Sequence, residues 1–205
     1  LHKLKVNPLV IAKIERPSAI KNIDEIIKVS DMIMVARGDM GVELGNHLVP
    51  AVQKELISKC NSVGTPVITA TQMLESMMVN STPTRAEASD VANAIWDGTD
   101  VVMLSGETAA GKFPIESVKM MHSIVIEAEK RPKERPFLRD VDLSSVNAAT
   151  MVAASLIAEK VKAKRIVSVT QSGNSCLKIT RFRPVVPVLG ITNEIRVVRR
   201  MTIFW

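Results

Sequence analysis

Charged and hydroxyl side chains follow four apolar runs, at points where a parallel α/β sheet would bring them together. In chain order they are Lys13, Glu15, Asp39, Thr71, Ser105 and Glu107. In parallel α/β folds, ligands bind at the carboxyl ends of the strands. The sequence therefore indicates one site assembled from four strand ends.

Lys13 and Glu15 are two positions apart on a predicted strand, so both side chains project from the same face. One interpretation is a surface ion pair that contributes little to stability. The other is a functional pair. The flanking residues are apolar, and burying an ionised pair in a strand costs desolvation free energy that a functional role would explain.

Asp39 supplies a second carboxylate at the same end of the predicted sheet as Glu15. Two carboxylates without a neighbouring His or Cys favour Mg²⁺ or Mn²⁺ over zinc. Gly38 either lets backbone amides approach an anion or permits a positive φ in a turn. Together with Lys13, these groups suit a phosphorylated or carboxylate substrate whose transition state gains negative charge.

The remaining polar positions are ambiguous when taken alone. Thr71 either hydrogen-bonds a substrate or caps the following turn, and the segment from Ser105 to Glu107 has the same two interpretations. The three histidines are scattered and form no Ser/His/Asp arrangement. The two cysteines, Cys60 and Cys176, have no metal-ligand spacing and are expected to be buried apolar residues.

Short β-branched runs alternate with longer helical patterns, which predicts βα units and a parallel sheet. The predicted strands cover residues 10–15, 32–36, 66–71, 101–105, 165–170 and 186–192. The predicted helices cover residues 20–29, 49–63, 85–96, 115–130 and 146–160. Thr84 and Glu87 have the spacing of a capping box at the start of the third helix.

Composition excludes several classes of protein. With 205 residues, 46% of them hydrophobic and 23% charged, the chain has the composition of a globular protein. No apolar run approaches the ~18 residues of a membrane span and no secretory leader is visible, so we expect a cytoplasmic protein with no membrane partner. Because the chain begins with Leu1 and ends in an apolar stretch, we expect a piece of a longer protein.

Charge is distributed unevenly along the chain. Residues 1–130 hold 13 Lys and Arg against 16 Asp and Glu, whereas residues 131–205 hold 14 against 5. Aromatic residues are only 3% of the chain, so the basic part lacks a stacking platform for nucleic acid. The change of sign coincides with a segment rich in proline and charge, which predicts a linker over residues 131–143.

Five segments together resemble the pyruvate kinase family. They are 11–15 (IAKIE), 34–43 (MVARGDMGVE), 70–76 (ATQMLES), 83–87 (PTRAE) and 103–108 (MLSGET), in the family's order and spacing. The resemblance implies that residues 1–130 are the second half of a catalytic (β/α)₈ TIM barrel, strands five to eight. It implies that residues 144–205 are part of a smaller C-terminal regulatory α/β domain.

The resemblance also implies an activity, the transfer of the phosphoryl group of phosphoenolpyruvate to ADP to give pyruvate and ATP. Glu15 and Asp39 would hold Mg²⁺ or Mn²⁺, and Lys13 would neutralise charge on the phosphoryl group and the enolate. The amides of Gly38 and Asp39 would bind the substrate carboxylate. Thr71 would hold the substrate and help to orient enolate protonation, through waters reaching Ser105 and Glu107.

Partners and effectors follow from the same resemblance. Potassium would bind through residues outside this chain, and the intact enzyme would be a homotetramer, with this chain inactive alone. A loop containing Thr170, Ser172, Gly173, Asn174 and Ser175 resembles the family's sugar-phosphate effector loop, although an ordinary βα turn remains open. Gln171 weakens an assignment to fructose 1,6-bisphosphate.

Two other functions remain open from the sequence. A Mg²⁺-dependent pyruvate or oxaloacetate aldolase or lyase would also bind an enolate on a metal ion in such a barrel. A catalytically silent, effector-binding fragment is the third possibility, because four strands cannot close an eight-stranded barrel.

Overall fold

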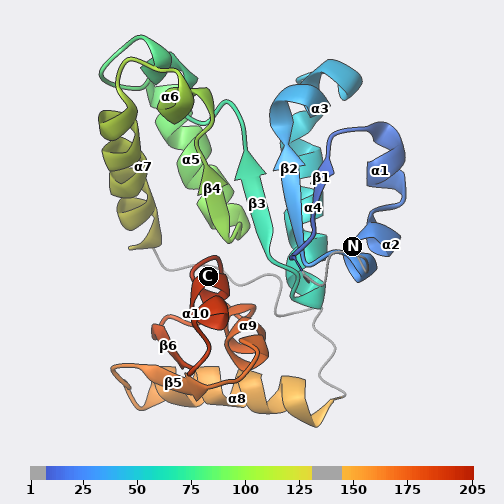
Figure 1. The fold of residues 1–205 in the computed structure, drawn as a ribbon, viewed down its shortest axis with the longest axis vertical. Coiled ribbons are helices and arrows are strands. Elements are labelled where there is room, and N and C mark those ends of the chain that lie inside the picture. Colours follow the sequence, from blue (N-terminus) through green and yellow to red (C-terminus); the bar gives the residue numbers. More distant parts are fainter. Residues whose placement is uncertain (1–7, 131–144) are drawn as a thin grey trace. The chain divides into compact units, whose positions relative to one another are not determined.

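The computed structural model describes residues 8–130 and 145–205, which form two compact units (Figure 1). The predicted linker over residues 131–143 lies outside the described residues. No helix within the described ranges is long and apolar enough to cross a membrane.

The first unit is built on a parallel sheet of four strands in the order β1-β2-β3-β4. The strands are β1 (Ile11–Ile14), β2 (Met32–Ala36), β3 (Val67–Ala70) and β4 (Val101–Met103). Each pairs with the next in sequence, as expected when a helical crossover follows every strand. The predicted parallel α/β class is confirmed. β2 has the predicted bounds, whereas β1, β3 and β4 are each two residues shorter than predicted.

Helices connect these strands. They are α1 (Pro17–Lys21), α2 (Ile23–Val29), α3 (Arg37–Leu44), α4 (Val49–Val63), α5 (Arg85–Asp97), α6 (Gly106–Ala109) and α7 (Pro114–Glu129), with a 3₁₀ turn, η2, at Glu75–Met78. The range predicted for α4 is confirmed to the residue. The single helix predicted over 20–29 is wrong, because the chain breaks at Asn22, whose backbone has φ −105° and ψ 20°.

The core of this unit lies between the sheet and two of the helices. Strand residues such as Ile33 and Val35 are fully buried and cluster with Ile23 of α2 and with Leu56 and Ile57 of α4. Strands that are buried on both faces consist of nearly continuous apolar residues, which is why these strands could be predicted from the sequence.

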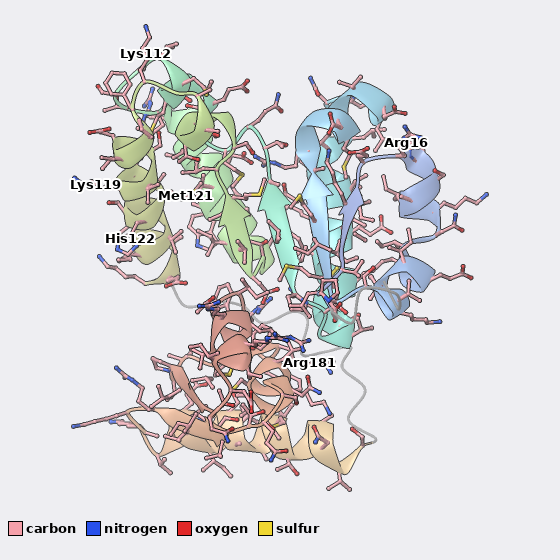
Figure 2. All side chains as sticks on the ribbon, in the orientation of Figure 1. Arg16, Lys112, Lys119, Met121, His122 and Arg181 are labelled. Carbon is pink, nitrogen blue, oxygen red and sulfur yellow. The ribbon has the colours of Figure 1, made fainter. Side chains whose placement is uncertain are left out.

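The predicted capping box at α5 is confirmed. The Thr84 hydroxyl accepts from the Glu87 amide at 3.2 Å, and the Glu87 carboxylate accepts from the Thr84 amide at 2.7 Å. On α7, Met121 is buried whereas Lys119 and His122 are exposed (Figure 2).

The second unit holds a two-stranded parallel sheet. Its elements are α8 (Val146–Lys160), β5 (Ile166–Val169), α9 (Asn174–Thr180), β6 (Val188–Ile191) and α10 (Ile195–Met201). Phe182, Cys176 and Ile179 are buried between these elements. Both cysteines of the chain are buried, as predicted, and burial raises the pKa of the Cys60 thiol to about 12.

Candidate functional site

Polar side chains from neighbouring strands meet at the carboxyl edge of the four-stranded sheet. Lys13 lies in β1 opposite Met34 of β2, and Glu15 follows β1 directly. Asp39 lies in the first turn of α3, which starts where β2 ends. Since the strands are parallel and in register, their ends share one edge of the sheet, and the predicted neighbours come within contact distance of one another.

Lys13 forms ion pairs with both predicted metal-binding carboxylates. Its Nζ lies 2.7 Å from Glu15 Oε2 and donates to Asp39 Oδ2 at 2.6 Å. The side chains of Lys13, Glu15 and Asp39 are 49%, 30% and 60% exposed, so the group faces solvent rather than the core. This exposure lowers the cost of ionisation and leaves the group open to a charged ligand.

The ion pairs shift the pKa values of both partners. The hydrogen bond to Asp39, followed by the one to Glu15, raises the pKa of Lys13 well above its usual range. The hydrogen bond from Lys13 lowers the pKa of Asp39 below its ordinary value. At neutral pH the pair of Lys13 and Asp39 therefore consists of an ammonium and a carboxylate.

Glu15 and Asp39 fit a hard divalent cation. Both direct an oxygen at one ammonium, so the two oxygens are close enough to share a positive centre. Apart from the Lys13 ammonium 2.7 Å away, buried Glu15 Oε2 has no hydrogen-bond partner within the described residues. Those residues contain no cluster of three or more His, Cys, Asp or Glu, so a bound ion would take its remaining ligands from substrate, water or other chain segments.

The segment after β2 differs from the predicted turn. Residues 37–44 form the helix α3, and Gly38 has no positive φ, so the turn role considered for it is wrong. A Cβ added at Gly38 would lie 3.4 Å from Thr71 Oγ1, so this glycine lets the chain after β2 come close to the chain after β3. Asp39 occupies the first turn of α3, where the helix dipole favours a carboxylate.

Thr71 is held in an unusual conformation immediately after β3. Its φ is +70° and that of Gln72 is +52°, which is the left-handed region that β-branched residues rarely enter. The Thr71 hydroxyl donates to the Ala70 carbonyl at 2.6 Å and accepts from the Gly38 amide at 2.8 Å. The Gly38 amide that was predicted to bind a substrate carboxylate thus donates to Thr71 in this structure.

Glu107 connects two loops at the same edge of the sheet. Its side chain is buried, with one oxygen accepting from the Leu74 amide at 3.1 Å and the other from the Ser105 amide at 2.8 Å. Ser105 precedes the short helix α6, which the sequence had suggested as a turn. Each carboxylate oxygen keeps a second lone pair, so these bonds leave room for another donor.

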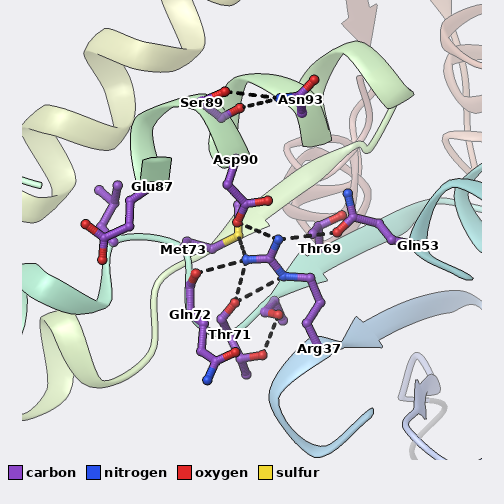
Figure 3. Close-up of polar contacts among 12 residues, drawn as sticks. Arg37, Gln53, Thr69, Thr71, Gln72, Met73, Glu87, Ser89, Asp90 and Asn93 are labelled. Carbon is purple, nitrogen blue, oxygen red and sulfur yellow. Dashed lines mark hydrogen bonds and ion pairs between the residues drawn. The ribbon is translucent and has the colours of Figure 1, made fainter. Parts of the chain in front are cut away.

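Sequence reasoning gave no role to Arg37, although it lies between the predicted strand and Gly38. Its guanidinium is buried and contacts the backbone after β3 together with side chains of α4 and α5 (Figure 3). The signal available in the sequence was a permanently charged residue placed directly after five apolar residues. The partners could not be read from it, because they lie up to 53 positions away.

The predicted effector loop joins β5 to α9 in the second unit. The Thr170 side chain is buried and accepts from the Gly173 amide at 2.9 Å, while the Ser172 hydroxyl accepts from the Asn174 amide at 3.4 Å. Gly173 has φ +83°, and an added Cβ would contact Met201 and Val197 at 3.4 Å. The loop therefore has an internal hydrogen-bond pattern typical of a βα turn.

Comparison with known sequences agrees with this architecture. The family model described as "Pyruvate kinase, barrel domain" matches residues 2–118, and "Pyruvate kinase, alpha/beta domain" matches residues 148–205. A protein named pyruvate kinase from Staphylococcus epidermidis is 49% identical over 209 residues, covering 100% of this chain and 36% of its own length.

Two further relatives carry the same name. That of Geobacillus stearothermophilus is 48% identical, covering 96% of this chain and 34% of its own length, and that of Clostridium acetobutylicum is 46% identical, with 97% and 43% covered. The chain thus spans about a third to two fifths of the length of these relatives. Because the barrel model alone covers more than half of its residues, the chain belongs to the pyruvate kinase family.

Proposed function

We propose that this chain forms part of a pyruvate kinase, an enzyme that transfers the phosphoryl group of phosphoenolpyruvate to ADP and releases pyruvate and ATP. The observation that carries the proposal is the placement of Lys13 between Glu15 and Asp39, at the carboxyl ends of adjacent parallel strands. Family membership supports it, since the relatives bear that name over the whole chain.

Lys13 is the residue to which we assign the largest catalytic effect. Its raised pKa keeps it cationic throughout the neutral range. A fixed ammonium stabilises a transition state in which negative charge spreads over a phosphoryl group and an enolate oxygen. Glu15 and Asp39 would hold Mg²⁺ or Mn²⁺, which would neutralise phosphoryl charge when bound.

Thr71 and its neighbours would handle the substrate carboxylate and the enolate. The substrate carboxylate would replace the Thr71 hydroxyl as the acceptor of the hydrogen bond from the Gly38 amide, and it would also approach the Asp39 amide. The released hydroxyl would then be free to orient a water for protonation of the enolate. Ser105 and Glu107 are the proposed continuation of that water path.

The finer assignments belong to the same proposal. Residues 1–130 would supply strands five to eight of a (β/α)₈ barrel, and residues 144–205 part of a regulatory domain. K⁺ would bind outside this chain, the complete enzyme would be a cytoplasmic homotetramer, and this chain alone would be inactive. The loop with Thr170 and Ser172 would bind a sugar-phosphate effector only after its internal hydrogen bonds rearrange.

The test is pyruvate release from phosphoenolpyruvate and ADP by the complete parent protein, with and without Mg²⁺. Lys13→Met should lower kcat by about 100- to 1,000-fold, the range for removal of one preorganised electrostatic group. Because Lys13 would act mainly in the transition state, kcat should fall more than KM for phosphoenolpyruvate rises.

Lys59→Met is the matched control. Lys59 also pairs with an aspartate, Asp24, at 2.8 Å, but on the helices rather than at the strand ends. This variant should keep the activity of the wild type. A folded parent without Mg²⁺-dependent kinase activity would instead favour the aldolase or the silent-module interpretation.

A further inference from the structure

The most densely hydrogen-bonded side chain near the candidate site is that of Arg37, which is 6% exposed. Its Nε and Nη2 donate to the Thr71 carbonyl at 3.2 and 2.7 Å, and Nη2 reaches the Gln72 carbonyl at 3.1 Å and Met73 Sδ at 2.8 Å. Its Nη1 donates to Asp90 at 2.7 Å and to Gln53 at 3.3 Å. Figure 3 shows these contacts converging on one guanidinium.

Two of these partners are the carbonyls of Thr71 and Gln72, both of which have left-handed backbones. Thr71 and Gln72 are neither glycine nor asparagine, so their positive φ values of 70° and 52° cost free energy that surrounding contacts must offset. Arg37 donates to both carbonyls. It therefore fixes the orientation of the two peptide groups on which the strained conformation depends.

That conformation sets the position of the Thr71 hydroxyl. The hydroxyl lies 2.8 Å from the Gly38 amide, and Gly38 is the residue directly after Arg37. The segment after β2 is therefore joined to the segment after β3 by two sets of hydrogen bonds. The Arg37 side chain donates to the Thr71 and Gln72 carbonyls, and the Gly38 amide donates to the Thr71 hydroxyl.

We propose that Arg37 is a positioning residue, which holds the backbone of Thr71 and Gln72 left-handed and so places the Thr71 hydroxyl beside the Gly38 amide. Arg37 acts through Thr71 and is not itself expected to touch substrate. The inference rests on the proposed function only where activity is the readout.

The geometry requires an arginine rather than any cation. The planar guanidinium presents five donors in a fixed fork, and here its three nitrogens reach two carbonyls, a sulfur, an amide oxygen and a carboxylate. A lysine ammonium has three donors at one point and cannot span these acceptors.

A double-mutant cycle in the complete parent protein tests the proposal. Arg37→Lys should lower kcat by about 100-fold in the wild-type background, the loss associated with a misplacement near 1 Å. In a Thr71→Val background the same substitution should lower kcat by less than about threefold, because the group it positions is already gone. Equal losses in the two backgrounds would overturn the proposal.

Arg183→Lys is the matched control, since Arg183 is equally buried and lies over the Trp205 ring at 4.7 Å in the second unit. It should leave kcat within about twofold of wild type. If Arg37→Lys fails to fold, Gln72→Gly should restore folding and part of kcat, because glycine adopts a positive φ without strain. A double variant that stays unfolded would assign Arg37 a purely structural role and overturn the proposal.

Hydrogen exchange at the Gly38 amide gives a readout that needs no activity. In the wild type this amide is bonded to the Thr71 hydroxyl. Arg37→Lys should make it exchange at least about tenfold faster, while Arg183→Lys should not. Unchanged protection would overturn the positioning role, whereas absent kinase activity in the wild type with faster exchange in Arg37→Lys would overturn the proposed function alone.

Discussion

At the residue scale, three charged groups that the sequence predicted to be neighbours are in contact, and one important arginine was missed. Lys13 and Glu15 could be placed together because a strand has a period of two, and Asp39 because parallel strands end at one edge. Arg37 could not be found in this way. Its partners at Thr71 and Gln72 are backbone carbonyls, which leave no trace in side-chain type, and they are 34 and 35 positions away.

The first prediction concerns the ionisation of Asp39. Its hydrogen bond with Lys13 favours the carboxylate and lowers its pKa below the ordinary value of 3.8. Any contribution of Asp39 to stability is therefore present above that ordinary value and lost as the pH falls through the lowered pKa. Lys13→Met should raise the pKa of Asp39.

The measurement is a ¹³C titration of aspartate carboxyl groups in wild type and Lys13→Met. The resonance that moves between the two proteins is assigned with Asp39→Asn. Equal midpoints in the two proteins would show that the ion pair does not persist in solution. Lys59→Met should leave that midpoint unchanged, because Lys59 pairs with Asp24.

At the element scale, most helices and strands could be predicted from local sequence patterns, whereas the others depend on contacts between distant segments. The helix over residues 49–63 and the α5 cap carry their signals in their own sequences. The helix α3 does not, because two of its eight residues, Gly38 and Gly41, have low helix propensity. It is held by burial of Arg37 and Met40, and such contacts between distant segments do not appear in a local pattern.

The second prediction concerns Glu87, which connects α5 to the loop after β3. Its carboxylate accepts from the Ser76 amide at 2.7 Å and the Ser76 hydroxyl at 2.5 Å, in addition to both Thr84 donors. Thr84→Ala should cost about 1 kcal/mol of unfolding free energy, the usual value for an N-cap. Glu87→Gln should cost roughly 2 kcal/mol, because charge-assisted hydrogen bonds are lost at both loops.

The cost of Glu87→Gln should also depend on pH. Burial raises the pKa of Glu87, but the hydrogen bonds from Ser76 and Thr84 outweigh it and lower the pKa below 4.5. The stabilisation is therefore present above pH 4.5 and is lost as the pH falls through the lowered pKa. Denaturant unfolding at several pH values measures both effects, and a cost that stays constant through the acidic range would contradict this account.

At the scale of the whole molecule, the sequence predicted that the four strands form part of a barrel. Within the described residues, β1 and β4 each pair with one strand only. The chain next to and within β1 exposes Leu9, Val10 and Ile11 at 44%, 43% and 46%. Apolar residues on an unpaired strand edge are a template for pairing with another chain.

The second unit adds an apolar sheet face. Val167 of β5 is in register with Leu189 of β6, and Val169 with Ile191. These four side chains are between 47% and 78% exposed. Exposed apolar groups gathered on one face, like an unpaired strand edge, promote association.

The third prediction is therefore that the 205-residue chain self-associates when it is produced alone. Light scattering should give a mass well above the 22.4 kDa of one chain, rising with concentration, and thermal melting should end in aggregation. Ile11→Lys should reduce the mass, because a charge on the edge strand opposes pairing. Val29→Lys, at an 80% exposed position on α2, is the control and should not. A monomer with one reversible transition would show that these surfaces do not drive association.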